Sequence, residues 1–557
     1  MPTGSAGLGR GSGLWAVGAV VTMLVVLPVL RLIYVVWIEG GSRLGEVFGR
    51  PGLDDAVVNT LLLAAAVTVV AVPLGAFVAL GLRRADVPGR RGWRFAMLLP
   101  VLVPQFVLGY SWTQAYGRAG FTDSTLGLQW SSVLGPWGVW AVLVVNTVPL
   151  TYLVAAVGLA TRAEPNLERA ARASGASSAS VLRDVTLPLL RPSIAAATVL
   201  SFVLTLESFA IPQVMGTPAG FTTVTTRIYR DLSLGSDPFS FVEALALALL
   251  LVAITVVIVV PADLWLTPRL RVTRVAHPEG APIVTPSGVV GRWIAAGLCG
   301  YLVAGVVLPL VALVVAALTP AVGVSPSPGN WTLDNFSLVV NSRTMEALGR
   351  SALLAFVAAA LLLVLGGLVA ILERRRAGRA LASLVTVTLV LPGSTLAVAL
   401  LITYGRWLGG TLVLVLLAYL AKLWAFAHRP ISGALDRLPD GELQAARASG
   451  AGPLTAVRTV ALRPLAPALL AAWLICFVTA LHEVTMSSLL YGPGSETLAV
   501  VVLNSQELGR IGPTAALSVL LTLIMLVAAL PLWLQISWLR SPRRMSDVRG
   551  RSLAHAP

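Results

Sequence analysis

Charged residues are scarce in this sequence. Only 12% of its 557 residues are Asp, Glu, Lys or Arg, about half of the fraction that is usual in soluble globular proteins. So few charges cannot cover a water-facing surface, and the mean hydropathy of +0.85 indicates lipid as the solvent. The hydrophobic runs are long and do not alternate with polar residues, which favours helices over a closed barrel. The sequence therefore predicts an all-α polytopic membrane protein.

Lysine and cysteine are almost absent, which argues against several kinds of site. The one lysine, Lys422, is followed by Leu423, so the chain has no Walker A loop, in which Ser or Thr follows the phosphate-binding lysine. Cys299 and Cys476 both lie in hydrophobic runs, which argues against a disulfide framework or a zinc site. No metal-ligand spacing and no nucleophile elbow occur. We predict no catalytic site, no metal site and no cofactor in this chain.

Twelve hydrophobic runs are long enough to cross a membrane. The first is too long for the h-region of a cleaved signal peptide, so we interpret it as a retained span. The first six predicted spans are 14–38, 56–82, 94–116, 133–160, 189–212 and 241–266. The second six are 291–319, 349–372, 380–404, 408–428, 464–490 and 514–538.

Arginines predict the orientation of these spans. They are concentrated in alternate loops, after spans two, four, six and eight and in the C-terminal tail, while the other loops are poor in them. An excess of Lys and Arg marks the cytoplasmic side of a membrane, so both termini are expected in the cytoplasm. The net charge of +15 comes from these short loops, and we therefore expect no binding of nucleic acid.

The chain divides into two related halves. The proline-rich stretch 267–290 lacks a hydrophobic run and is the predicted cytoplasmic linker between halves 1–266 and 291–557. Each half has an arginine-rich turn after its second span and a Leu-Pro in its third, Leu99-Pro100 and Leu391-Pro392. Six spans per half give the two halves one orientation, with an axis along the membrane normal. The first span of each half is expected at the periphery.

A repeated loop lies between the fourth and fifth span of each half. Residues 169–176 read Arg-Ala-Ala-Arg-Ala-Ser-Gly-Ala, and residues 444–451 read Gln-Ala-Ala-Arg-Ala-Ser-Gly-Ala. Gly175 and Gly450 suit the end of a short helix, where a left-handed residue often follows. An ordinary alanine-rich connector explains one copy equally well, but two copies at equivalent places favour a function.

The repeated loop resembles the EAA loop of binding-protein-dependent ABC importer permeases of the type I architecture. The resemblance implies that the loop docks on an ATPase through Glu168, Arg169, Ala170, Ala171, Gly175, Gln444, Ala445, Ala446 and Gly450. Arg169 and Gln444 stand where the family usually has Glu, although Glu168 and Glu442 are close by.

The resemblance also implies the partners and the location of the chain. ATP and Mg would be bound by a separate ABC ATPase, as a homodimer, and the substrate would arrive on an extracytoplasmic binding protein. The chain would lie among the lipids of a bacterial plasma membrane. A major facilitator transporter is the alternative, because it too has twelve spans in two halves. The loop 81–91 is similar to that superfamily's first loop, but Asp86 is one position late and the second half has no such loop.

The substrate expected from this resemblance is ferric iron. Fused halves are typical of the ferric-iron and thiamine permeases, and segments 206–212 and 483–487 look most like ferric-iron permeases. Thiamine, phosphonate and polyamine are the alternatives.

Two glutamates are candidates for the translocation pathway. Glu207 and Glu483 each lie nineteen residues after a proline, Pro188 and Pro464, that begins the fifth span of its half. An ionisable residue in a span usually faces a polar cavity, so the two carboxylates are expected to face each other across the pathway. Ser208, Gln213, His482, Thr485 and Ser487 are the other expected lining residues. The alternative is that each glutamate caps a broken helix and contacts nothing transported.

Overall fold

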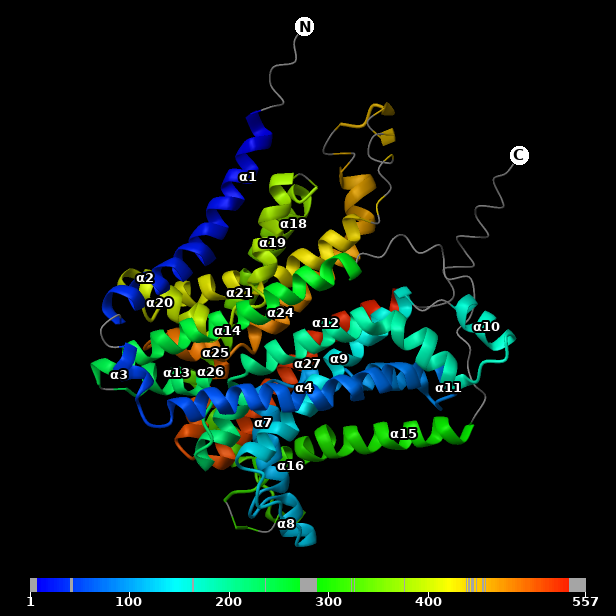
Figure 1. Ribbon diagram of the computed structural model, residues 1–557. Coiled ribbons are helices and arrows are strands. Elements are labelled where there is room, and N and C mark those ends of the chain that lie inside the picture. Colours follow the sequence, from blue (N-terminus) through cyan, green and yellow to red (C-terminus); the bar gives the residue numbers. More distant parts are fainter. Residues whose placement is uncertain are drawn as a thin grey trace.

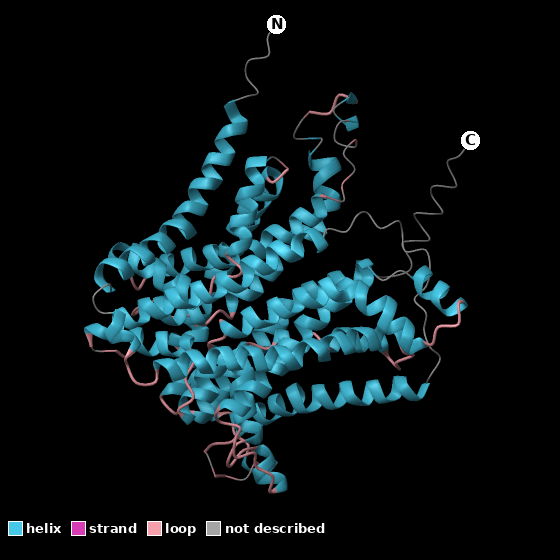
Figure 2. Cartoon of the chain, in the orientation of Figure 1, coloured by secondary structure: helices cyan, strands magenta, loops and turns pink. Residues whose placement is uncertain are grey.

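The fold consists of helices, as the sequence predicts. The computed structural model describes residues 8–40, 44–162, 165–235, 237–270, 288–321, 323–324, 326–374, 376–436, 438, 441, 445–446, 448–452, 455 and 457–539. Figure 2 shows helices joined by loops. Within the described ranges the only β-contact is an isolated bridge between Gly410 and Tyr491. The prediction of an all-α polytopic protein is confirmed.

The first half, residues 8–270, contains these elements: α1 (Leu8–Val21), η1 (Thr22–Val26), α2 (Leu27–Gly40), α3 (Leu44–Phe48), α4 (Leu53–Arg84), α5 (Arg90–Ala96), α6 (Leu99–Leu102), α7 (Gln105–Tyr116), α8 (Phe121–Leu126), α9 (Pro136–Arg162), α10 (Pro165–Ala173), α11 (Ser178–Val181), η2 (Leu182–Thr186), α12 (Leu187–Leu206), η3 (Pro212–Gly216), η4 (Thr217–Ala219), α13 (Val224–Ser233) and α14 (Pro238–Leu270).

The second half, residues 288–539, contains these elements: α15 (Gly288–Leu302), η5 (Val303–Val307), α16 (Leu308–Leu318), η6 (Pro328–Asn330), α17 (Asp334–Val339), α18 (Ser342–Leu372), α19 (Arg376–Val387), α20 (Gly393–Leu408), α21 (Leu412–Leu435), η7 (Val457–Ala461), α24 (Leu462–Leu481), α25 (Thr485–Leu490), α26 (Leu498–Glu507) and α27 (Ile511–Leu539).

Two of the twelve predicted spans are broken. Among the described residues, ten helical segments are long and hydrophobic enough to cross a membrane without a break. The third predicted span, 94–116, bends by 94° between residues 102 and 105, and the ninth, 380–404, is divided between α19 and α20. Pro104 and Pro392 stand directly before α7 and α20 with extended backbone angles. Because proline has no N–H and disfavours a helical residue before it, it favours a break of the helix at these two positions.

The fifth and eleventh spans end earlier than predicted. The sequence indicates spans that reach 212 and 490, whereas α12 ends at Leu206 and α24 at Leu481. Each ends just before one of the two candidate glutamates. The predicted linker 267–290 is also shorter, because α14 continues to Leu270 and α15 begins at Gly288; its central part, 271–287, lies outside the described residues.

The first span of each half packs against the other half. Helices α1 and α2 contact α18, α19 and α20, while α15 and α16 contact α4, α5 and α7. Both crossing spans lie at the edge of the molecule, since Trp15 is 79% and Trp293 is 75% exposed, and this confirms the expected peripheral position. Figure 1 shows α1 rising away from α4 and α15 running alongside α4.

A tyrosine anchors each crossing span. The hydroxyl of Tyr404 in α20 donates to the Met23 carbonyl at 2.7 Å, and that of Tyr116 in α7 donates to the Ala304 carbonyl at 2.6 Å. Both acceptors lie in π-helical turns, η1 and η5. Such a turn departs from the regular i→i+4 bonding of the helix, and its carbonyls are accessible to an outside donor. The two halves therefore repeat this contact.

A glycine brings the second and fourth spans close together in each half. A Cβ on Gly75 of α4 would lie 2.6 Å from the backbone nitrogen of Tyr152, and one on Gly366 of α18 would lie 2.9 Å from that of His428. Near the ends of the same helix pairs, Arg83 donates to the Leu159 carbonyl and Arg374 to the Leu435 carbonyl, the latter at 2.9 Å. Repeated contacts of this kind show that the two halves share one packing scheme.

Candidate functional site: coupling loops and pathway

The first repeated loop is a short helix with a glycine turn after it. Helix α10 ends at Ala173, and Gly175 follows with φ of +89°. The Ala176 N–H donates to the Ala171 carbonyl at 3.0 Å, and the Gly175 N–H donates to the Arg172 carbonyl at 2.9 Å. This pair of bonds is a Schellman motif, in which the left-handed residue is usually glycine.

The second repeated loop has the same turn. Gly450 has φ of +85°, and the Ala451 N–H donates to the Ala446 carbonyl at 3.1 Å. Ala445 is exposed and Ala446 is half-buried, while Gln444 lies outside the described residues. The prediction that both glycines adopt φ > 0 is confirmed.

Glu168 is held inside the chain, unlike its neighbour in the first loop. Its side chain forms an ion pair with Arg84 at the end of α4 and accepts a hydrogen bond from the Thr186 hydroxyl at 2.8 Å. Glu168 is 7% exposed, whereas Arg169 and Ala170 are exposed and Ala171 is half-buried. Glu168 therefore fixes the position of α10, and Arg169 lies on its accessible face.

Glu207, at the C-terminal end of α12, contacts the second half of the chain. Its carboxylate is 2.6 Å from the Lys422 ammonium of α21. Lys422 donates in addition to the Leu389 and Leu391 carbonyls, at 3.1 and 2.8 Å. These carbonyls lie at the break between α19 and α20, where they lack helical partners. One lysine therefore donates to the unpaired carbonyls and also pairs with the Glu207 carboxylate.

The position equivalent to Lys422 in the first half is Asn146 of α9, 276 residues earlier. Its amide donates to the Pro100 carbonyl at 3.2 Å and accepts from Gln105 at 3.0 Å. Both halves thus place a polar side chain of the fourth span against the broken third span. Within the described residues, only Lys422 of these two side chains bonds to a residue of the opposite half. The sequence analysis did not identify Lys422 as a candidate site residue.

Glu483 caps a helix in its own half. Its carboxylate accepts from the Met486 and Ser487 N–H groups at 2.8 and 3.0 Å and from the Ser487 hydroxyl at 3.0 Å. These groups belong to the first turn of α25, which begins at Thr485. The geometry is that of the helix-capping alternative, and within the described residues no hydrogen bond or ion pair joins Glu483 to Glu207.

The remaining predicted lining residues have separate surroundings. The ring of His482 contacts the Val478 carbonyl at 2.7 Å, in its own helix. The Ser208 hydroxyl is buried and has no hydrogen-bond partner among the described residues. Gln213 donates to Glu507 of the second half at 3.1 Å, and the Tyr229 hydroxyl donates to the same carboxylate at 3.3 Å. Gln213 and Glu207 are thus the two predicted residues that join the halves.

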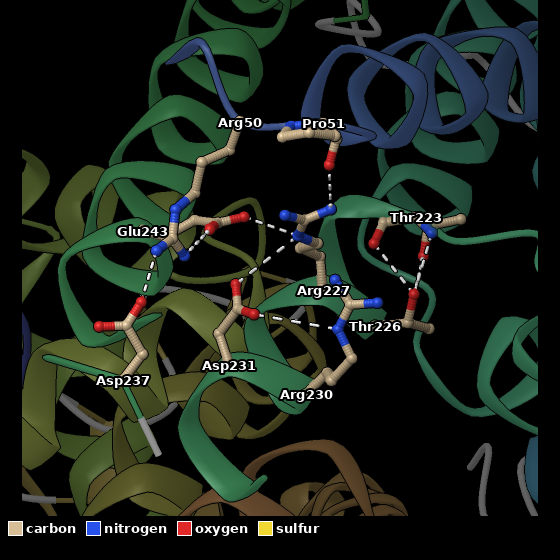
Figure 3. Close-up of polar contacts among 9 residues, drawn as sticks. All are labelled: Arg50, Pro51, Thr223, Thr226, Arg227, Arg230, Asp231, Asp237 and Glu243. Atoms are coloured by element: carbon tan, nitrogen blue, oxygen red, sulfur yellow. Dashed lines mark hydrogen bonds and ion pairs between the residues drawn. The ribbon is translucent and has the colours of Figure 1, made fainter. Parts of the chain in front are cut away.

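Helix α13, which carries Tyr229, is held by a partly buried network of charges (Figure 3). Glu243 has no exposed surface, and it pairs with Arg227 at 2.6 Å and Arg50 at 3.0 Å. Arg50 also pairs with Asp237 at 2.6 Å. Because these residues come from α13, α14 and the turn before α4, the network fixes α13 in place. The signal for it is in the sequence, since Glu243 is an ionisable residue in the sixth hydrophobic run.

Within this charge network, Asp231 has a strongly raised pKa. Burial and the nearby Glu243 carboxylate raise the pKa of Asp231 from 3.8 to about 6, although Arg227, Arg230 and Arg50 oppose the shift. Among the described residues, no group of three or more His, Cys, Asp or Glu side chains is arranged to hold a metal ion.

Comparison with known proteins gives a family match in each half. The profile of the family described as "Binding-protein-dependent transport system inner membrane component" matches residues 71–272 and 362–536. These ranges together cover more than half of the chain and include both repeated loops. No part of the first spans 14–38 and 291–319 is matched, and these are the spans that cross to the opposite half.

Several relatives match most or part of the chain. The probable ABC transporter permease protein y4fN of Sinorhizobium fredii is 25% identical, over 91% of this chain and 92% of its own length. The Fe(3+)-transport system permease protein FbpB 2 of Haemophilus influenzae is 24% identical, over 86% of this chain and 89% of its own length. The molybdenum transport system permease protein ModB of Escherichia coli is 31% identical, over 31% of this chain and 78% of its own length.

Proposed function

The chain belongs to the family of binding-protein-dependent transport system inner membrane components, and we propose that it is the fused permease of a ferric-iron importer. That it is a multi-pass permease of an ABC importer follows from the family and from relatives that match both halves. Ferric iron is supported by the similarity to the Fe(3+)-transport permease of Haemophilus influenzae, which extends over both halves. The molybdenum relative corresponds to about one half only.

The family match in both halves also decides against the alternative class. A major facilitator transporter would not match this family, and the similarity of loop 81–91 to that superfamily ends at Asp86. Thiamine, phosphonate and polyamine stay as alternative substrates, and the ModB relative adds molybdate to them.

The proposed orientation has both termini in the cytoplasm, with halves 1–266 and 291–557 joined by the linker 267–290. The positions of Arg83, Arg84 and Arg374 support it, because they lie at the ends of α4 and α18 nearest the loops after the fourth spans. In Figure 1, α10 lies on the same side of the molecule as the C-terminal end of α4, where Arg84 pairs with Glu168 of α10. Both repeated loops would then face the compartment that contains ATP.

In this proposal the two loops are the docking points for the ATPase. Ala170 and Arg169 of α10 and Ala445 of the second loop are exposed, so a cleft on a partner can receive them. The ATPase, a homodimer, would bind ATP and Mg, and an extracytoplasmic binding protein would deliver the substrate. Glu168 would act through its ion pair with Arg84, which holds α10 at the correct angle.

Glu207 and Gln213 are the predicted pathway residues that the contacts support best, because both lie between the halves. Glu483, His482, Thr485, Ser487 and Ser208 stay predicted lining residues of the pathway. The Glu207 carboxylate is paired with Lys422 in this conformation. A cation in transit would therefore meet a free carboxylate at this position only after that pair has opened.

The ligand of the cognate binding protein tests the substrate directly. We expect the protein purified from the periplasm or cell surface to carry iron, measured by inductively coupled plasma mass spectrometry. Deletion of the permease should abolish uptake of radioactive ferric iron, and the wild-type gene should restore it. A binding protein that carries molybdate, thiamine, a phosphonate or a polyamine, with normal iron uptake in the deletion strain, would overturn the proposal.

A further inference from the structure

The two halves are joined at Glu207 by an ion pair that crosses between them. Glu207 belongs to the first half, and the described partner of its carboxylate, the Lys422 ammonium, belongs to the second. The side chains of Glu207 and Lys422 are only 13% and 12% exposed. Breaking this pair costs free energy until water or a transported cation replaces the lysine, because an unpaired charge in such surroundings is strongly unfavourable.

Unlike Glu207, Lys422 retains hydrogen bonds when the halves separate. It keeps the Leu389 and Leu391 carbonyls, which belong to its own half and lie at the break before α20. Separation therefore leaves the lysine partly satisfied and the glutamate unsatisfied. The energetic cost of opening this contact falls mainly on Glu207.

A second polar contact accompanies the ion pair. Gln213 and Tyr229 of the first half both donate to Glu507 at the end of α26. Figure 1 shows the helices of the two halves close together around α13, α25 and α26, and farther apart toward α10 and the upper end of α18. The polar contacts thus lie where the halves meet, and the repeated loops lie where they diverge.

We propose that Glu207 and Lys422 form an ionic latch between the two halves, which keeps the pathway closed at rest and has to open in each transport cycle. The inference rests on the proposed coupling of this permease to an ATPase. Opposite movements of the two halves separate α12 from α21, and so break the ion pair of Glu207 with Lys422. The latch biases the resting transporter toward the closed arrangement until the partners supply the energy to open it.

Removing the latch tests this inference in the complete complex. We would reconstitute the permease with its ATPase in proteoliposomes and measure ATP hydrolysis without binding protein. Glu207→Gln and Lys422→Met are each expected to raise this basal rate about five-fold or more. The double variant should match the single variants and not exceed them, because both substitutions break the same contact.

A matched control lies within one half. The ion pair between Arg343 and Glu496 is 2.6 Å long and joins two parts of the second half, so Glu496→Gln should leave the basal rate unchanged. A merely structural role of Glu207 and Lys422 would lower the yield and the melting temperature of the variants without raising basal hydrolysis. Basal rates within two-fold of the wild type would overturn the latch.

A crosslink at the second contact tests the same motion with Glu207 and Lys422 intact. Gln213→Cys with Glu507→Cys, in a background of Cys299→Ala and Cys476→Ala, would be joined by a short, reducible thiol crosslinker. We expect the crosslink to abolish stimulation of the ATPase by the binding protein, and reduction to restore it. Arg343→Cys with Glu496→Cys is the control within one half. Full stimulation of the crosslinked complex would contradict the latch, whereas failure of iron uptake would contradict only the proposed substrate.

Discussion

Glu168 and Thr186 are 18 residues apart in the chain, and their side chains meet at 2.8 Å on the inner side of the first repeated loop. Because Glu168 also pairs with Arg84, the short helix α10 is tied both to the end of α4 and to η2, the turn that leads into α12. A force on α10 can therefore be passed to two spans at once. This connection gives the loop a defined position against any partner.

Glu168→Gln is expected to weaken the coupling between the ATPase and the permease. Loss of the charged hydrogen bonds should lower the free energy of unfolding by about 1–3 kcal/mol and reduce transport several-fold. Thermal unfolding in detergent and substrate-stimulated ATP hydrolysis would measure the two effects. Asp184→Asn is the control, since it removes the same charge from an exposed carboxylate nearby. Equal effects of both variants would contradict the role assigned to Glu168.

The left-handed conformation of Gly175 and Gly450 predicts which substitutions the two repeated loops tolerate. Among the described residues, no atom lies within 4 Å of a Cβ built on Gly175 or Gly450, so the strain of a substitution comes from the positive φ. Gly175→Glu and Gly450→Glu should each cost about 1–2 kcal/mol locally and abolish transport, while the protein still inserts in the membrane.

Asparagine at the same positions is the matched control. It adopts the left-handed region more easily than other residues, so Gly175→Asn and Gly450→Asn should retain most of the transport. Uptake assays and immunoblots of membrane fractions would give both results. If the glutamate variants transported normally with their ATPase, the assignment of these loops to coupling would be wrong.

Alanine substitutions at two neighbouring glycines of α18 should have different effects on stability. A Cβ on Gly366 would lie 2.9 Å from the Ala427 Cβ, whereas one on Gly367 would have no atom within 4 Å. Gly366→Ala should destabilise the protein by about 1–3 kcal/mol, because the close contact of α18 and α21 is overpacked. Gly367→Ala should be neutral or stabilise it by up to about 1 kcal/mol through helix propensity. The order of the two melting temperatures is the test, and a reversed order would contradict the packing.

The raised pKa of Asp231 predicts a stability that increases on mild acidification. With a pKa of about 6 in the folded protein against the ordinary pKa of 3.8 for an aspartate, the folded state holds the proton more tightly than the unfolded chain. The free energy of unfolding contributed by Asp231 therefore falls as the pH rises from about 4 to 6, and stays low above 6. Asp231→Asn should remove this slope and stabilise the protein at pH 7 by up to about 2 kcal/mol, after allowance for solvent screening.

Asp237 supplies a control of opposite sign. The Phe239 N–H and Arg50 lower the pKa of Asp237, so the stability that it contributes is lost as the pH falls through the acidic range. Melting temperatures of the wild type and the two Asn variants between pH 3 and 7.5 would separate the contributions. A wild type and an Asp231→Asn variant with identical pH profiles would contradict the prediction for Asp231.

The sequence by itself determined the fold class, the two related halves and the conformation of the loop glycines. Each of these depends on local signals: hydrophobic runs of sufficient length, a repeated order of residues, and a glycine placed after a short helix. The breaks in the third and ninth spans also have a local cause in Pro104 and Pro392. They were not predicted, because proline is tolerated inside other spans, as Pro73 of α4 and Pro149 of α9 show.

Only the tertiary structure decided what the two equivalent glutamates contact. Glu207 and Glu483 have the same place in the repeat, yet one pairs with Lys422 of the opposite half and the other caps α25 in its own. The difference arises because the equivalent of Lys422 is the shorter, neutral Asn146, which bonds within its own half. A repeat in sequence fixes equivalent backbone positions, but the partner of a buried charge depends on which side chains the packing of the two halves brings within reach.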